Sequence, residues 1–156
     1  MVSIIAGLQQ RASITPSFSG WSMRRLKSSL TTCIWSLALR GDSPKNADIA
    51  EQLTQLIDEN SVKIIGVIRQ EVLSGYSDKS SFDGLRRKLS YFPNESIIDS
   101  DYEAAAEYSN FCRTKGIQGS HIDYLICAVA IRKKFKVYTV DKDFLHYSKH
   151  LPVLLF

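Results

Sequence analysis

The strongest constraint in this 156-residue sequence is the alternation of short apolar segments with longer segments of helical periodicity. A short strand running into a helix is expected over residues 30–35, and further strands over residues 61–66, 96–98, 136–140 and 151–156. Helices fill the intervals between these strands. This alternation is typical of an α/β domain with a central, mostly parallel sheet. We therefore predict one α/β domain over residues 28–156.

Polar and small residues mark where several of these helices begin and end. Ser43-Pro44 is typical of a helix start. Gly75 and Gly116 are expected to end two of the helices. Ser100 with Glu103, and Ser120 with Asp123, have the spacing of a capping box.

The first 27 residues differ from the rest of the chain. They are rich in Ser, Arg and Gln, contain no acidic residue and show no sustained apolar period. We interpret them as a poorly ordered extension, with a transit peptide and a partner-binding basic arm as alternatives. The net charge of +4 arises near this end, because the five basic residues before Asp42 have no acidic counterpart. The remaining 15 basic and 16 acidic residues nearly balance, so pI alone does not indicate nucleic-acid binding.

The three cysteines lie far apart in the sequence, without the spacing of a zinc motif. That distribution favours a reducing compartment over a disulfide framework. No apolar run approaches the length of a membrane span, so neither a membrane partner nor a transmembrane segment is expected. We expect the protein in the cytoplasm, unless the N-terminal residues are a transit peptide.

Glu71 is the first candidate for site chemistry. It follows Val67 by four residues and Ile68 by three, which predicts a place on the buried face of a helix. A buried carboxylate is costly unless it is paired or bound to a cation. The structural alternative is a salt bridge to a nearby arginine.

Further acids fall where strands end and helices begin. Asp123 is the fourth residue of a capping box, and capping alone would explain it. Asp141 follows the strand expected over residues 136–140, at the end where parallel sheets place their ligands. Asp143 is suited to cap the next short helix, and turn formation is the alternative for both aspartates.

Taken together, Glu71, Asp123 and Asp141 are candidate ligands of a divalent cation. Converging carboxylates repel one another unless a cation lies among them, and Mg²⁺ or Mn²⁺ prefers such oxygen ligands. A cluster of this kind is suited to phosphodiester hydrolysis.

Four segments, in order along the chain, resemble the motifs of VapC-type PIN domains. They are Thr31-Thr-Cys-Ile-Trp35, Gln70-Glu71-Val-Leu-Ser-Gly75, Gly119-Ser120-His-Ile-Asp123 and Thr139-Val-Asp141-Lys-Asp143-Phe144. The resemblance runs from about residue 28 to the C-terminus.

The resemblance implies a three-layer sandwich around the parallel sheet and an endoribonuclease toxin dependent on Mg²⁺ or Mn²⁺. It also implies an RNA substrate, a VapB-like antitoxin and a homodimer. By position it assigns Glu71, Asp123 and Asp141 to the metal cluster and to catalysis. Asp143 is then an accessory acid, Ser120 and Thr139 are candidate polar supports, and Trp35 is expected in the core.

Thr31 departs from the family's pattern, which has an aspartate there after an apolar strand. The segment before it, Arg24-Arg-Leu-Lys-Ser-Ser-Leu30, is too polar for an ordinary central strand. A neutral hydroxyl does not supply a carboxylate's charge to a cation, so we expect an impaired nuclease.

Two other functions remain as alternatives. One is a catalytically inactive PIN-fold protein that binds RNA or an antitoxin. The other, far weaker, is a receiver-type α/β domain, which needs an acidic pair after an early strand, where this chain has Thr31-Thr32.

Overall fold

The computed structural model describes residues 27–40 and 47–156. Residues 1–26 of the proposed extension, and the helix start expected at Ser43-Pro44, lie outside these residues. Within the described part of the chain, no helix is long and apolar enough to cross a membrane.

In the described part of the chain, five parallel strands form the central sheet, in the order β3-β2-β1-β4-β5. Their bounds are Ser28–Leu30 (β1), Val62–Ile65 (β2), Asn94–Glu95 (β3), Lys136–Tyr138 (β4) and Leu154–Leu155 (β5). Because every neighbouring pair is parallel, each connection crosses over the sheet, and this confirms the α/β prediction.

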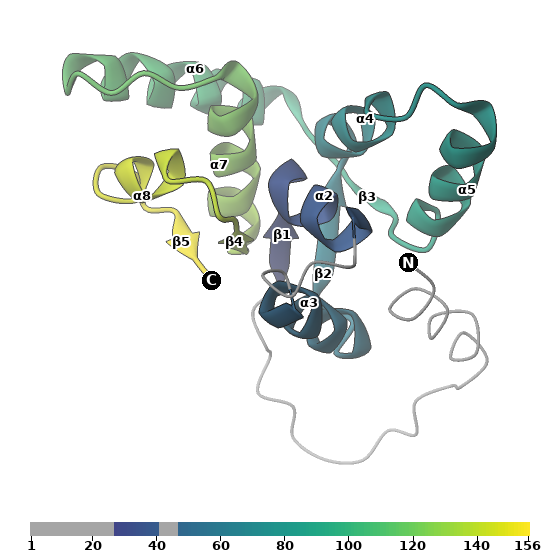
Figure 1. Ribbon diagram of the computed structural model, residues 1–156. Helices are drawn as coiled ribbons and strands as arrows, with labels where there is room; N and C mark the ends of the chain where they lie inside the picture. The colour runs from purple at the N-terminus through teal and green to yellow at the C-terminus, as the bar shows by residue number, and fades with distance from the viewer. Residues whose placement is uncertain (1–26, 41–46) are drawn as a thin grey trace.

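Helices connect the strands along the described chain. They are α2 (Thr32–Arg40), α3 (Ala47–Asp58), α4 (Gly66–Ser74), α5 (Lys79–Leu89), α6 (Asp99–Thr114), α7 (His121–Lys133) and α8 (Asp143–Tyr147). Right-handed crossovers, the rule for parallel strands, place α2–α5 on one face of the sheet and α6–α8 on the other. Figure 1 shows this arrangement, with α2 and α3 in front of β1 and β2, and α7 beside β4. The three layers agree with the expected sandwich.

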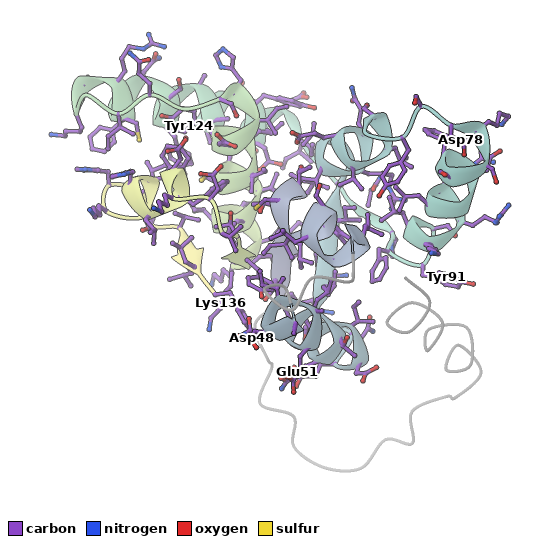
Figure 2. The ribbon with its side chains drawn as sticks, in the orientation of Figure 1. Asp48, Glu51, Asp78, Tyr91, Tyr124 and Lys136 are labelled. Atoms are coloured by element: carbon purple, nitrogen blue, oxygen red, sulfur yellow. The ribbon has the colours of Figure 1, made fainter. Side chains whose placement is uncertain are left out.

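Each helix buries one side against the sheet or a neighbouring helix. In α3, Leu53 and Leu56 are buried, whereas Asp48 and Glu51 project to solvent (Figure 2). Helix α7 differs, because its residues from Tyr124 to Ala130 are all buried. It is therefore the central helix of the core rather than one with a single apolar stripe. Ile122, in the first turn of this helix, is 39% exposed.

The polar strand β1 is the main correction to the sequence analysis. It spans Ser28–Leu30 rather than beginning at Leu30, and it lies between β2 and β4 in the middle of the sheet. Ser28 and Ser29 are buried there, and the Ser28 hydroxyl lacks a hydrogen-bond partner among the described residues. Backbone pairing on both sides outweighs the strand's polarity, since an unpaired buried backbone group would cost more than a buried hydroxyl.

Two further boundaries differ from the prediction. The strand expected over residues 96–98 lies at Asn94–Glu95, because the Ser96 carbonyl accepts a hydrogen bond from Arg132 instead of a strand. The Ser100 and Glu103 capping box does not form. Helix α6 begins at Asp99, and the Asp101 carboxylate accepts from the Ile98 N–H at 2.9 Å.

Several local predictions are confirmed. Gly75 is the C-cap of α4, and Gly116 follows α6 with a φ of 75°. Trp35 is 3% exposed and packs edge-on against Phe92, with 5.2 Å between ring centroids.

Candidate active site

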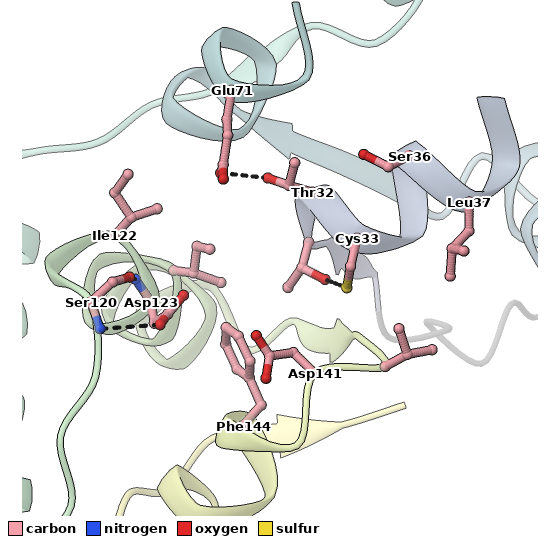
Figure 3. Close-up of a pocket in the computed structure, with 13 residues that line it drawn as sticks. Thr32, Cys33, Ser36, Leu37, Glu71, Ser120, Ile122, Asp123, Asp141 and Phe144 are labelled. Carbon is pink, nitrogen blue, oxygen red and sulfur yellow. Dashed lines mark hydrogen bonds between the residues drawn. The ribbon is translucent and has the colours of Figure 1, made fainter. Parts of the chain in front are cut away.

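A cavity of about 590 Å³ opens at the carboxyl edge of the sheet, beside β1 and β4. The strand order reverses between these two strands, because the chain continues from β1 toward β2 on one side and later returns to β4 on the other. Such a switch point is where open parallel sheets hold their ligands. Figure 3 shows that side chains from α2, α4, α7 and the segment after β4 face this space.

Glu71 reaches the cavity from α4, which follows β2. The prediction of a buried helix face is wrong, since Ile68 and Val72 are buried while Glu71 is exposed at the cavity. Its partner is a hydroxyl rather than an arginine: Thr32 Oγ1 donates to Glu71 Oε2 at 2.6 Å (Figure 3). This bond fixes one carboxylate oxygen beside the start of α2.

Asp123 lies in the first turn of α7, and the predicted capping box is present. The Asp123 N–H donates to the Ser120 hydroxyl at 3.0 Å, and the Ser120 N–H donates to Asp123 Oδ2 at 3.2 Å. The Tyr147 hydroxyl, from α8, also donates to Asp123 Oδ2 at 3.2 Å. Capping and a position at the cavity are therefore compatible for this residue.

Tyr147 is fully buried, and its ring packs against Tyr124 and Phe144. Burial, followed by the nearby Asp123 charge, raises the pKa of Tyr147 above its ordinary value. The same two causes, burial first, raise the pKa of Cys127 to about 12. Because its pKa is raised, the Tyr147 hydroxyl remains a neutral hydrogen-bond donor over the physiological pH range.

Asp141 lines the cavity from the segment that follows β4. The strand ends at Tyr138, two residues earlier than predicted, because the Thr139 hydroxyl accepts the Asp141 N–H at 3.0 Å. Asp141 Oδ1 in turn accepts the Asp143 N–H at 3.0 Å. The Asp143 side chain itself is not among the residues that line the cavity.

Thr31 also lines the cavity, directly after β1, but its side chain is buried and turned toward β4. Its hydroxyl donates to the Tyr138 carbonyl at 3.3 Å and lies 2.9 Å from the Cys33 sulfur. Cys33 is in turn 3.5 Å from the Thr139 hydroxyl. Neutral groups thus line the cavity after β1, together with the acids of α4, α7 and the segment after β4.

Each of the three acids has one carboxylate oxygen that could serve as a ligand to a divalent cation. In the described ranges, Glu71 Oε1, Asp123 Oδ1 and Asp141 Oδ2 accept no hydrogen bond, so one oxygen of each is available. Oxygen donors of this type suit Mg²⁺ or Mn²⁺. Nevertheless, no three acidic, His or Cys residues among those described lie close enough together to hold an ion. The carboxylate oxygens are the type of ligand that such a cation prefers. They line the cavity, but they do not converge on a single position.

Sequence reasoning missed three contributors to this geometry: Thr32, Cys33 and Tyr147. The position of Thr32, beside Thr31 at the start of a helix, was a usable signal. Tyr147 gave none, because an aromatic residue in a short amphipathic segment is most simply explained as core.

The fold and this cavity define the chain as an α/β protein with carboxylates at the carboxyl edge of a parallel sheet. The PIN domain family model matches residues 30–150, and the chain belongs to that family.

Solved structures of similar fold agree with this assignment. VapBC2 from Rickettsia felis, bound to a DNA fragment from its promoter, has a TM-score of 0.68 at 19% identity, covering 84% of this chain and 98% of that chain. FitAcB from Neisseria gonorrhoeae has a TM-score of 0.62 at 20% identity, covering 83% and 96%. FitAB bound to an IR36 DNA fragment has a TM-score of 0.63 at 19% identity, covering 83% and 93%. Comparison with curated proteins gives no significant match.

Proposed function

We propose that this chain is a VapC-type ribonuclease toxin that depends on Mg²⁺ or Mn²⁺ and is impaired by Thr31. The observation that carries the proposal is the cavity at the switch point, which is lined by three acids from distant segments: Glu71, Asp123 and Asp141. The PIN family and the fold similarity to VapBC2 and FitAB support it.

Glu71, Asp123 and Asp141 would hold the cation. When bound, such a cation supplies Lewis-acid stabilisation of the charge that develops on a phosphodiester during hydrolysis. The chain's other residues orient these carboxylates. Thr32 holds Glu71, the Ser120 backbone holds Asp123, and the Asp143 N–H together with Thr139 holds Asp141.

The impairment follows from charge. An aspartate after β1 would add a fourth carboxylate between the other three, whereas the Thr31 hydroxyl is neutral and already bonded to Tyr138. Fewer anionic ligands bind a divalent cation more weakly and position the substrate phosphate less well. We therefore expect cleavage to be slowed by orders of magnitude relative to an aspartate-containing site.

The partners follow from the same proposal. The neighbouring structures are VapBC and FitAB assemblies bound to DNA or solved as complexes, so a VapB-like antitoxin is the partner proposed for this chain. A homodimer in the cytoplasm completes the proposal, since twofold symmetry is the commonest arrangement of homo-oligomers.

Thr31 also favours a second function. If the chain lacks cleavage altogether, the PIN fold can still bind RNA or the antitoxin through surfaces that need no cation. This alternative predicts partner binding that is insensitive to EDTA.

The test compares RNA cleavage by the natural chain, Thr31→Asp and Thr31→Asn in Mn²⁺. Thr31→Asp restores the carboxylate and is expected to cleave at least about tenfold faster than the natural chain. Thr31→Asn has nearly the same shape without the charge and is expected to remain slow. Adding Glu71→Gln to Thr31→Asp is expected to abolish the gain.

Equal cleavage by Thr31→Asp and Thr31→Asn would contradict the role assigned to position 31. Absence of cleavage in every variant, together with EDTA-insensitive RNA or antitoxin binding, would favour the second function.

A further inference from the structure

Tyr147 joins two segments that the sequence separates by 24 residues. Its hydroxyl donates to Asp123 Oδ2 at 3.2 Å, and its side chain is 0% exposed. The ring is fixed by its neighbours, with centroids 5.1 Å from Tyr124 and 5.4 Å from Phe144. The Tyr147 side chain is therefore held in one conformation by its two ring contacts, and its hydroxyl is directed at the Asp123 carboxylate.

Gly119 leaves the space that the Tyr147 hydroxyl occupies. A Cβ at position 119 would lie 2.2 Å from that hydroxyl oxygen and 2.8 Å from the Cζ atom of the same ring. Both distances are shorter than any real contact, so a larger residue would push the buried ring aside. The glycine is therefore required by close approach, not by its backbone conformation.

The bond determines which oxygen of Asp123 faces the cavity. Oδ2 accepts from two donors, the Ser120 N–H and the Tyr147 hydroxyl, which lie on different elements. Two donors on one oxygen fix the carboxylate plane about the Cβ–Cγ bond. Oδ1 accepts no hydrogen bond within residues 27–40 and 47–156. Asp123 lines the cavity together with Asp141 (Figure 3).

We propose that Tyr147, seated against Gly119, is a positioning residue that holds Asp123 so that its free oxygen is available to a divalent cation. This inference rests on the proposed function and adds to it a residue from α8 that does not line the cavity. Partners that orient a ligand in this way change metal affinity about 10- to 100-fold when they are removed.

The test measures Mn²⁺ affinity by calorimetry for the full chain, with and without Thr31→Asp. Tyr147→Phe removes the donor and keeps the ring, so Mn²⁺ binding is expected to weaken about tenfold or more. Tyr124→Phe is the matched control. That buried hydroxyl, on the neighbouring ring, has no hydrogen-bond partner among the described residues, and its removal is expected to change Mn²⁺ affinity less than about twofold. Gly119→Ala is expected to weaken binding as Tyr147→Phe does.

A double-mutant cycle with Asp123→Asn separates positioning from general loss of structure. If Tyr147 acts through Asp123, Tyr147→Phe has little further effect on Mn²⁺ affinity once Asp123 is changed. An equal loss in both backgrounds would overturn the inference, as would a Tyr147→Phe effect no larger than that of Tyr124→Phe.

The outcome also distinguishes this inference from the proposed function. Saturable Mn²⁺ binding by Thr31→Asp that Tyr147→Phe leaves unchanged overturns the positioning role alone. No saturable Mn²⁺ binding by the folded Thr31→Asp chain overturns the proposed function and this inference with it.

Discussion

Thr31 shows how one side chain changes the chemistry of a site without changing the fold around it. Its backbone N–H and its hydroxyl both donate to the Tyr138 carbonyl, at 3.1 and 3.3 Å, and so join β1 to β4 where both strands end. The residue is 4% exposed. A carboxylate in this place would be costly without a cation, whereas a hydroxyl is satisfied by its neighbours. The threonine is therefore hydrogen-bonded in the metal-free protein and adds no charge to the cavity.

Asp101 differs from the cavity acids, because its charge is neutralised within the protein by an arginine. It is 1% exposed and accepts two hydrogen bonds from Arg132, both of 2.6 Å. The Arg132 guanidinium lowers the pKa of Asp101 below its ordinary 3.8, more than burial raises it. The pair connects the start of α6 to the end of α7, far from the cavity acids.

We predict that Asp101→Asn lowers the free energy of unfolding by about 3 kcal/mol at pH 7, because Arg132 is left without its anion. The folded-state pKa of Asp101 lies below the unfolded value, so the pair's contribution is complete above about pH 4. It is lost as pH falls through the lower, folded-state pKa. Urea unfolding between pH 7 and pH 2 measures both effects. If the natural chain and Asp101→Asn differ equally at pH 7 and pH 2, the charge is not the cause.

For single residues, the sequence predicted which acids lie at the site better than it predicted their burial and their hydrogen-bond partners. Asp123 was expected in a capping box, and it forms one. Glu71 was expected on the same buried face as Ile68, but α4 is turned so that Ile68 and Val72 are buried while Glu71 is exposed. Helical spacing identifies residues that share a side, but a short helix with apolar residues on more than one side has no unique orientation until it is packed. Tyr147 depended wholly on tertiary contacts.

Among the elements, β1 and the start of α6 show where the local sequence pattern fails, and the start of α7 shows where it holds. A strand with two buried serines was not expected at the centre of a sheet, yet hydrogen bonding to both neighbours places it there. Ser100 and Ser120 have the same sequence signal, a serine followed three residues later by an acid. Ser120 caps α7, whereas Ser100 lies inside α6, because Asp101 takes the capping role when Arg132 binds it.

We predict that Ser120→Ala lowers the free energy of unfolding in EDTA by about 1 kcal/mol, since the Asp123 N–H loses its acceptor. Ser100→Ala is the matched control, and it is expected to change stability by less than about 0.5 kcal/mol. Alanine is the better helix former inside the first turn, so a slight gain is expected there. Urea unfolding at neutral pH measures both variants. A larger loss of unfolding free energy for Ser100→Ala than for Ser120→Ala would contradict the assignment of Ser120 as the N-cap.

Over the whole molecule, the prediction from the sequence was most complete. Alternating strands and helices require crossovers, and right-handed crossovers pack the helices against a parallel sheet. The strand order, and with it the switch point, came only from the structure. The sequence also placed Asp141 and Asp123 at the ends of elements that meet there, and both line the cavity. It could not predict how closely the acids approach, because that distance depends on side-chain packing from four separate elements. The described residues do not close the acids into an ion-holding group.

The most direct test of the central claim is thermal unfolding in EDTA and then with Mn²⁺ added, for the natural chain, Thr31→Asp and Thr31→Asp with Asp123→Asn. Thr31→Asp is expected to melt below the natural chain in EDTA, because it places a carboxylate at a buried position beside three other acids. Its melting temperature is expected to rise by roughly 5 °C or more with saturating Mn²⁺. The natural chain is expected to show a smaller saturable rise, and the variant without Asp123 is expected to lose most of its rise. No Mn²⁺-dependent rise in either the natural chain or Thr31→Asp would contradict the claim that Glu71, Asp123 and Asp141 form a cation site.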